Sequence, residues 1–600
     1  MNHSNHLHRL PAGLALAVAP CIFLLINLLS GLPARGDSVL NSPHNLTATG
    51  TGSIKSGTTN NVCIFCHTVH KANGVTPLWN HTMSSVSNYV VYSSTRLNNL
   101  GLTVPQPNGS SRLCLSCHDG TVALGSISSS AAPVQLFQNG NIVTTMPGNR
   151  SSNPNNLGTD LSGDHPVSMD YDAAAQADVT LKSRATLNPL IKLEPLNGKN
   201  YIQCTSCHNP HDDKNGNFLV IKNDSSALCV VCHQPDQWTT SAHALSSTPV
   251  PQAILAKRAG GASASAKAVA ANSVSTSMRA LGCENCHMNH RSGAKQHLLQ
   301  SAVPEQNCLV CHNGRTVQKN LAADFQKPSI HPITLNSQTH SSVEDPINPK
   351  TRHVVCADCH NSHAAIQKKA AAPNASGALA GVTGVTAAGG VIKPVLNEYE
   401  LCFRCHADSV ARGPATVTRQ YPETNTRLQF SVANQSYHPV ERAGKNPNSV
   451  PSLIAPWTVN SLMYCTDCHN SDSGSGAGGA GANGPHGSIF APILERNLVI
   501  TDNQSESTFA YALCYKCHDR SRVLSNQSFR FHSSHIVNDK AACTTCHDSH
   551  GAANSPHLIN FNTTYVTASS LGTINYTAMG TFKGVCTLTC HGYDHKNTAY

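Results

Sequence analysis

Charged and aromatic residues are scarce in this sequence. Charged residues make up 12% of its 600 residues and aromatic residues 5%, whereas typical globular proteins carry about 25% charged residues. Gly (41) and Pro (33) are plentiful, so the chain can bury only a small core of its own side chains. This composition argues against a cytosolic enzyme with a conventional core. Beyond the N-terminal region there is no long apolar run, which argues against an integral membrane bundle.

The N-terminal region reads as an export signal. Arg9 is its only early fixed charge, residues 12–30 carry none, and small residues follow at 31–36. This pattern predicts a signal peptide over residues 1–36. An uncleaved anchor that spans the membrane once is the alternative, because the apolar stretch is long enough. We therefore expect an exported protein in the periplasm, at the outer-membrane surface or outside the cell.

Cysteine and histidine are abundant instead, with 25 Cys and 34 His. Cys21 lies in the predicted leader, and we expect it to be inert. The other cysteines form twelve closely spaced pairs, and a His follows the second member of each pair. In chain order, and numbered motifs 1 to 12 below, they are Cys63/Cys66/His67, Cys114/Cys117/His118, Cys204/Cys207/His208, Cys229/Cys232/His233, Cys283/Cys286/His287, Cys308/Cys311/His312, Cys356/Cys359/His360, Cys402/Cys405/His406, Cys465/Cys468/His469, Cys514/Cys517/His518, Cys543/Cys546/His547 and Cys586/Cys590/His591.

The first eleven motifs have the pattern C-x-x-C-H, and motif 12 has one extra residue between its cysteines. C-x-x-C-H is the attachment signature of c-type haem. Two thiols one short turn apart can bond to the vinyl groups of one porphyrin, and the next side chain then reaches the iron as proximal ligand. A zinc site or a redox dithiol would leave the repeated His unexplained. We expect twelve covalently attached haem c groups, which would leave the exported chain with no spare thiol.

Five motifs continue as C-H-x-x-H, and these second histidines are candidate distal ligands. They are His70, His211, His290, His363 and His550. Two residues three apart on a helical turn project to the same side, so the second His cannot reach the opposite face of the same haem. We expect it to ligate a neighbouring haem. Motif 9 lacks this neighbour, but His486 follows it after a Gly-rich insert, and we assign His486 the equivalent role.

A second set of candidate distal ligands lies upstream of alternate motifs. It consists of His44, His165, His243, His331, His438 and one of His532 and His535, of which we take His535. An exposed or hydrogen-bonded surface His is the alternative for any one of them. His81, His297, His340, His353, His557 and His595 remain as replacements or bystanders, with His81 and His353 the strongest replacements.

The predicted fold is mostly irregular, with short α-helices at the motifs, little β structure and porphyrins as the core. The motifs group into six diheme modules. The predicted boundaries are 37–200, 201–255, 256–330, 331–435, 436–530 and 531–600. The low-complexity stretches 253–277, 370–390 and 471–484 are expected to be surface loops, and residues 560–583 could form a hairpin. Folding should depend on haem attachment.

The formal net charge of +9 does not indicate nucleic-acid binding. Each haem brings two propionates, so Lys and Arg are expected to pair with these carboxylates. There is no basic run and no recognised nucleic-acid motif.

With its C-H-x-x-H motifs, residues 113–121 (LCLSCHDGT) and residues 162–167 (SGDHPV), the chain resembles the doubled-CXXCH multihaem c-type cytochromes, the outer-surface and periplasmic electron carriers of metal-reducing bacteria. The resemblance implies closely packed haems with two His ligands, low reduction potentials and transfer toward acceptors such as metal oxides. It also implies other c-type cytochromes or outer-membrane conduit proteins as partners. Some relatives assemble into haem-lined filaments.

Three functions remain open. A non-catalytic electron conduit needs irons with both axial positions filled, and it is the leading interpretation. A terminal multihaem reductase would keep one open iron site. A filament subunit would leave one haem without a distal His from its own chain.

Overall fold

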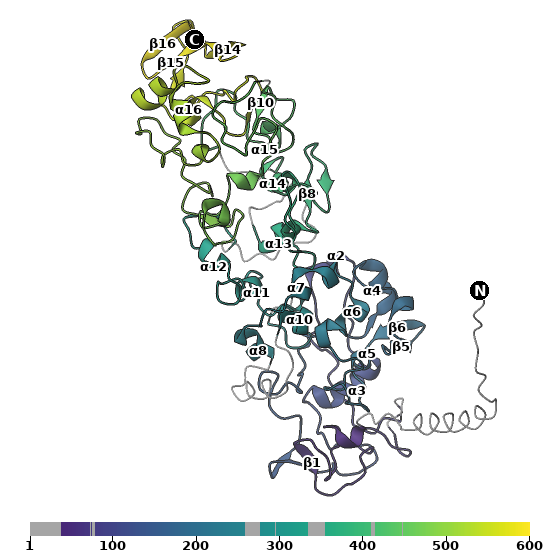
Figure 1. Ribbon diagram of the computed structural model, residues 1–600. Helices are drawn as coiled ribbons and strands as arrows, with labels where there is room; N and C mark the ends of the chain where they lie inside the picture. The colour runs from purple at the N-terminus through teal and green to yellow at the C-terminus, as the bar shows by residue number, and fades with distance from the viewer. Residues whose placement is uncertain are drawn as a thin grey trace, which may run out of the picture.

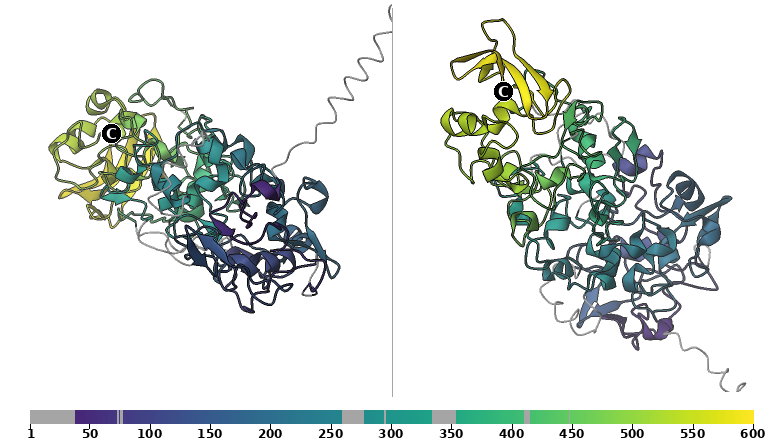
Figure 2. Two further views of the ribbon diagram at one scale, coloured as in Figure 1. Left: turned by 90° about the horizontal axis from the view of Figure 1, so that it is seen from below. Right: turned by 45° about the horizontal axis from the view of Figure 1, so that its top comes forward.

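The computed structural model describes residues 38–600, except residues 73, 75–77, 259–276, 294–295, 334–353, 410–414 and 447. The molecule is elongated (Figure 1), and the N-terminal, middle and C-terminal parts of the described chain broadly succeed one another along its long axis. One end carries β1 (Ile54–Ser56) and the other carries the C-terminal strands. Two further views show the same order (Figure 2). The predicted signal peptide and the candidates His340 and His353 lie outside the described residues.

Helix accounts for 23% of the chain and strand for 16%, so most of it is irregular. Many helices are single turns capped by a polar side chain. Ser94, Asp170 and Asn320, for example, each accept a hydrogen bond from the third backbone N–H of the helix that follows, which satisfies an otherwise unpaired donor.

The α-helices are α2 (Thr95–Asn99), α3 (Gly109–His118), α4 (Tyr171–Ala177), α5 (Cys204–Cys207), α6 (Cys229–Cys232), α7 (Ala242–Leu245), α8 (Gln252–Arg258), α10 (Met278–Leu281), α11 (Gln306–Leu309), α12 (Leu321–Asp324), α13 (Cys356–Cys359), α14 (Glu398–His406), α15 (Thr426–Gln429), α16 (Arg520–Leu524) and α17 (Cys543–Cys546). Short 3-10 helices include η5 (Gly282–Asn285), η8 (Cys465–Asp467) and η10 (Cys514–Lys516).

The sheets are small and antiparallel. β1 pairs with β2 (Leu136–Gln138), which pairs with β3 (Asn141–Val143); β6 (Lys199–Ile202) lies between β4 (Met169–Asp170) and β5 (Glu194–Leu196); β8 (Gly384–Val385) pairs with β9 (Val391–Ile392). Two pairs join distant segments: β7 (Ser329–Ile330) with β11 (Gly487–Ser488), and β10 (Ser436–Tyr437) with β12 (Gly551–Ala552).

The largest sheet lies at the C-terminus. β15 (Lys583–Cys590) pairs with β13 (Val566–Thr567), β14 (Asn575–Gly580) and β16 (Tyr593–Ala599). β14 and β15 form a hairpin that begins inside the predicted stretch 560–583, but the strands continue to residue 599. The sheet therefore includes motif 12, where the sequence pattern predicted no strand.

The apolar clusters of the described residues are small and separate. One cluster contains Tyr399 and Phe403 of α14 with Val385 of β8, and another contains Tyr511, Ile536 and Ala542. Such clusters are small for a chain of this length, which agrees with the scarcity of aromatic residues.

The low-complexity stretch 370–390 was expected to be a surface loop, and this expectation is wrong for its second half. Val382 and Val385 are 4% and 1% exposed, and Val385 packs against α14. The added Cβ of any substitution at Gly384 would come within 2.4 Å of Val395. The small residues therefore allow close packing here. Within the described part of the chain, no helix combines the length and the apolar character of a membrane span.

Candidate cofactor sites

Motifs 1 to 11 share one local geometry, a single helical turn. In nine of them the backbone N–H of the His donates to the carbonyl of the first Cys four residues earlier, at 2.8 to 3.0 Å. Motifs 2 and 8 lie inside α3 and α14. A helical turn brings residues three and four apart to one side, so both thiols and the imidazole of each motif lie on one face. Among the described residues, no cysteine is taken up in a disulfide, as thioether attachment requires.

Motif 12 differs because Cys586 and Cys590 lie on β15. His591 and Gly592 form the two-residue turn between β15 and β16, both with positive φ (51° and 77°). Positive φ at both central residues is the geometry of a type I′ hairpin turn. The extended strand places the His of this motif differently from the other eleven.

Thiols of consecutive motifs lie close together along the whole chain. Cys114 hydrogen-bonds to Cys204, and this bond and burial raise the pKa of Cys114 well above its ordinary value. The same kind of bond joins Cys229 to Cys283, Cys308 to Cys356, Cys402 to Cys465, and Cys514 to Cys543. These bonds connect each even-numbered motif to the motif that follows it.

The second cysteine of each odd-numbered motif interacts with a cysteine of the motif that follows it. Each of the following pairs of thiols interacts electrostatically: Cys66 with Cys117, Cys207 with Cys232, Cys286 with Cys311, Cys359 with Cys402, Cys468 with Cys514, and Cys546 with Cys590. Every motif therefore has a thiol that interacts with a thiol of the next motif, from motif 1 to motif 12.

Two of the predicted attachment cysteines differ from the others in exposure. Cys63 and Cys405 are exposed, whereas the other described cysteines are partly buried. Twelve copies of one motif predict one environment for all their thiols, and these two residues depart from it. Cys405 follows the buried Phe403 by two residues on α14, and residues two apart on a helix do not share a face, so Cys405 lies away from the apolar cluster.

The exposed Cys405 still lies beside the neighbouring motif. It interacts electrostatically with Cys359 of motif 7, as Cys402 does. Both thiols of motif 8 are therefore near motif 7, and the role of Cys405 in haem attachment stays a prediction.

Histidine rings also face each other in pairs, which we call imidazole pairs. Their ring centroids lie 6.0 to 6.5 Å apart. The pairs are His44 with His118, His67 with His211, His165 with His233, His208 with His290, His243 with His312, His287 with His363, His331 with His406, His360 with His486, His469 with His550, His532 with His547, and His535 with His595. His518 interacts electrostatically with His438.

The pairs follow a regular pattern. The second His of C-H-x-x-H in an odd-numbered motif faces the motif histidine two motifs earlier, as His211 faces His67 and His290 faces His208. His486 behaves in the same way toward His360. The His upstream of an odd-numbered motif faces the next even-numbered motif, as His44 faces His118. Every such pair connects segments that are far apart in the sequence.

Backbone carbonyls orient the rings. The Nδ1 atoms of His118, His208 and His287 lie 2.7 to 2.8 Å from carbonyl oxygens of Asn155, Asn217 and His297. A carbonyl can only accept, so Nδ1 must carry the proton. Nε2 then keeps its lone pair, the form in which imidazole binds a metal. The distal candidates His165, His243, His331 and His535 have the same kind of Nδ1 contact.

Burial keeps several of the paired imidazoles neutral. Burial, together with the charge of a neighbouring His, lowers the pKa of His44, His363 and His406 to about 4. Burial followed by His469 lowers the pKa of His550 to about 3. These rings are therefore unprotonated at neutral pH, as metal ligation requires.

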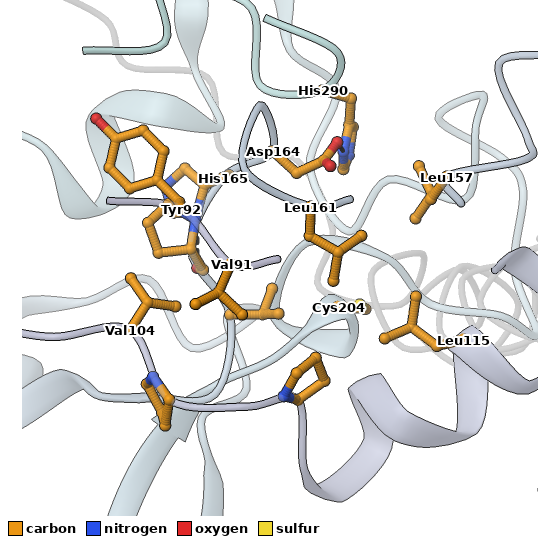
Figure 3. Close-up of a pocket in the computed structure, with 14 residues that line it drawn as sticks. Val91, Tyr92, Val104, Leu115, Leu157, Leu161, Asp164, His165, Cys204 and His290 are labelled. Carbon is orange, nitrogen blue, oxygen red and sulfur yellow. Dashed lines mark hydrogen bonds and ion pairs between the residues drawn. The ribbon is translucent and has the colours of Figure 1, made fainter. Parts of the chain in front are cut away.

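An apolar pocket lies at motif 3. Leu115, Leu157 and Leu161 gather around Cys204, and the ring of His290 lies at its edge (Figure 3). Nδ1 of His290 lies 3.1 Å from a carboxylate oxygen of Asp164, which also pairs with Arg150. The pocket offers a thiol, an oriented imidazole and apolar walls, which fits a covalently attached porphyrin.

Four predicted site histidines do not join an imidazole pair of the described residues: His438 and His518, which interact only electrostatically, and His70 and His591. His70 is exposed. Nε2 of His591 lies 2.8 Å from a carboxylate oxygen of Asp502. Two residues in pairs, His532 and His595, were not among the twelve distal choices. The short distance in sequence between His532 and motif 11 could have identified His532. His595 could not be identified in this way, because its position depends on the pairing of β15 with β16. His81 is fully buried beside the Thr82 carbonyl.

Residues 194–237 match the family model of the doubled CXXCH motif. This segment contains motifs 3 and 4. The match supports the resemblance to doubled-CXXCH multihaem c-type cytochromes, and it indicates covalently bound haem c and a role in electron transfer. A comparison with curated proteins finds no match.

Proposed function

We propose that this protein is a dodecahaem c-type cytochrome that conducts electrons through closely spaced haems with two His ligands each. The proposed acceptor is extracellular or periplasmic, such as a metal oxide. The proposed partners are other c-type cytochromes or outer-membrane conduit proteins. The observation that carries the proposal is the unbroken series of interacting thiols from motif 1 to motif 12.

The imidazole pairs support ligation on both sides of each iron. Two imidazoles that bind one metal ion through bonds of about 2.0–2.1 Å place their ring centroids about 6.3 Å apart. The observed separations are 6.0 to 6.5 Å. Rings in direct stacking contact would lie closer; His44 and Phe218 lie 4.2 Å apart. The gap therefore suits one intervening atom.

The chain's own residues would hold, orient and shield each group. The cysteines would attach it, the motif His and distal His would ligate its iron, and backbone carbonyls hold the Nδ1 proton of rings such as His118 and His331. Haem c supplies a one-electron iron couple at each site. Filling both axial positions leaves no place for a substrate, which favours conduction over a reductase.

The holoprotein tests the proposal directly. Mass spectrometry should find twelve haems on one chain, and electron paramagnetic resonance of the oxidised protein should show only low-spin ferric centres. The reduced holoprotein mixed with a soluble ferric chelate should reoxidise at all haems. A stoichiometric high-spin signal, or haem groups that remain reduced while others are oxidised, would contradict a continuous conduit.

A further inference from the structure

Motif 12 is the exception to the arrangement of the other motifs. If the pairing pattern continued, His535, upstream of motif 11, would face the motif histidine of motif 12, as His331 faces His406. His535 instead faces His595, with ring centroids 6.2 Å apart and an interplanar angle of 22°. This geometry matches that of His287 with His363, at 6.2 Å and 18°.

His591 is engaged elsewhere. Its Nε2 contacts Asp502, whose side chain is fully buried. The same carboxylate accepts from the Ala542 N–H at 2.9 Å and from the Thr545 hydroxyl. Six of the other motif histidines place Nδ1 on a backbone carbonyl, as His118 and His287 do, which leaves Nε2 available. Asp502 thus fixes the β15–β16 turn through the nitrogen that a ligand would need.

The register of β15 and β16 places His595, and not His591, on the face of the sheet that carries the motif 12 thiols. His595 on β16 is opposite Leu588 on β15. Leu588 and Cys590 are two residues apart, so they share a face of the sheet, and residues directly opposite on antiparallel strands project to the same face. His595 therefore lies on the face that carries Cys590. Both thiols of motif 12 interact electrostatically with Cys546 of motif 11, which places them beside the preceding site.

The rings of His535 and His595 are also in a state that can bind a metal. Nδ1 of His535 lies 2.8 Å from the Phe531 carbonyl oxygen, so its Nε2 keeps the lone pair. Nδ1 of His595 is buried without a hydrogen-bond partner, and Tyr593 packs edge-on against the ring at 4.6 Å. A buried polar atom without a partner is costly unless a ligand occupies the site.

We propose that His595 and His535, and not His591, are the axial ligands of the haem attached to Cys586 and Cys590. The iron ligand then comes from the strand that follows the motif, five residues after the second cysteine. This inference rests on the proposed function, because it assumes that motif 12 carries haem.

The test compares His595→Ala with His591→Asn in the full-length oxidised holoprotein. Mass spectrometry counts the haems, and electron paramagnetic resonance reports their spin states. We expect His595→Ala to keep its haem count and to show one high-spin ferric haem, which added imidazole returns to low spin. His591→Asn should remain entirely low-spin.

A His595→Ala protein that stays low-spin overturns the inference, whatever His591→Asn shows. A high-spin haem in His591→Asn with all haems retained also overturns it. Should His595→Ala fail to accumulate, His595→Met replaces it and should convert one haem from His/His to His/Met ligation; an unchanged spectrum again overturns the inference. Failure of the proposed function would differ, because the wild-type protein itself would then lack haems or show high-spin centres.

Discussion

At the residue scale, identical motif positions have different surroundings, and this allows a controlled test. His211 and His70 are both the second His of C-H-x-x-H. His211 faces His67 at 6.0 Å, whereas His70 is exposed and belongs to no imidazole pair of the described residues. We predict that His211→Ala produces one high-spin haem per chain and that His70→Ala, the matched control, leaves every haem low-spin.

Electron paramagnetic resonance of the two oxidised holoproteins checks this prediction, with haem counts by mass spectrometry. A low-spin His211→Ala protein would show that the His67–His211 arrangement does not reflect ligation. A high-spin haem in His70→Ala would show that the exposed His70 ligates a haem, contrary to the pairing pattern.

Asp164 should tune one haem through His290. Its buried carboxylate accepts from Nδ1–H of His290 at 3.1 Å, and a carboxylate partner makes an imidazole a stronger donor to its metal. A stronger donor favours ferric iron, so Asp164→Asn should raise the reduction potential at motif 3. A tenfold loss of preference for the ferric state corresponds to about 59 mV, and partner changes of this kind reach about tenfold.

Spectroelectrochemical titration measures the shift, with Asp172→Asn as the control. Asp172 forms a half-exposed ion pair with Arg184. Equal titration curves for Asp164→Asn and the wild type would refute the tuning role.

The sequence picked out most of the histidines that form imidazole pairs, but not their partners and not the exposure of the thiols. Eleven of the twelve motif histidines lie on the predicted helical turns. Most chosen distal histidines, such as His243 and His486, do face a motif histidine. Which motif each one faces depends on contacts between distant segments, and no local pattern encodes them. The exposure of Cys405 was not predictable either, because it follows from which face of α14 packs against the apolar cluster. His595 was missed because its position follows from the register of β15 and β16.

At the element scale, one lysine joins segments that carry two distal candidates. Nζ of Lys327 contacts Asp324 of α12 at 2.6 Å and Asp472 at 2.8 Å. It also donates to Ser471 and Ser473 at 3.1 and 2.9 Å. β7 and β11 pair directly beside this cluster. His331 follows β7 and His486 precedes β11, so the cluster holds both rings in position.

We predict that Lys327→Met loosens residues 471–488. Removing one partner of a buried ion pair costs about 3 kcal/mol, so amide protection there should fall by about 100-fold. Hydrogen exchange at neutral pH measures it. Lys214→Met, which removes an ion pair whose lysine side chain is 57% exposed, should have no such effect. Unchanged protection in Lys327→Met would show that β7–β11 pairing alone holds the segment.

The same lysine predicts a pH dependence. Burial alone would lower the pKa of Lys327, but its bonds to Asp324 and Asp472 outweigh burial and raise it. A raised folded pKa stabilises the folded state below the unfolded value of about 10.4, and this contribution is lost as pH rises through the folded pKa. The difference in thermal midpoint between wild type and Lys327→Met should therefore be constant from about pH 7 to 9 and shrink at higher pH.

Elements were only partly predictable. The short helices at the motifs follow from the local spacing of Cys and His. The Ala/Gly-rich stretch 370–390 was misread because small residues signal either a loop or close packing, and only the partner decides. Here Glu400 of α14 supplies backbone within 2.6 Å of a Cβ added at Gly384.

At the scale of the whole molecule, the helices that carry motifs 2, 3, 7 and 8 (α3, α5, α13 and α14) follow one another from the β1 end toward the C-terminal end (Figure 1). Imidazole pairs such as His208 with His290 cross the boundaries predicted for the six modules. The linear order was predictable from the repeated motif. The interlocking was not, since it arises from the two-motif offset between each C-H-x-x-H histidine and its partner.

The whole molecule should fold only when its haems are attached. Its apolar clusters are small; the largest centres on Tyr399, Phe403 and Phe430. Imidazole pairs with a gap between their rings hold nothing together by themselves. We predict that the chain without haem, made where attachment does not occur, is expanded. Small-angle scattering should give a radius of gyration approaching the roughly 90 Å expected for an unfolded chain of this length, against about 24 Å for a compact one. The holoprotein is the control, somewhat above the compact value because it is elongated. A compact haem-free chain with native-like near-ultraviolet circular dichroism would show that side-chain packing alone specifies the fold.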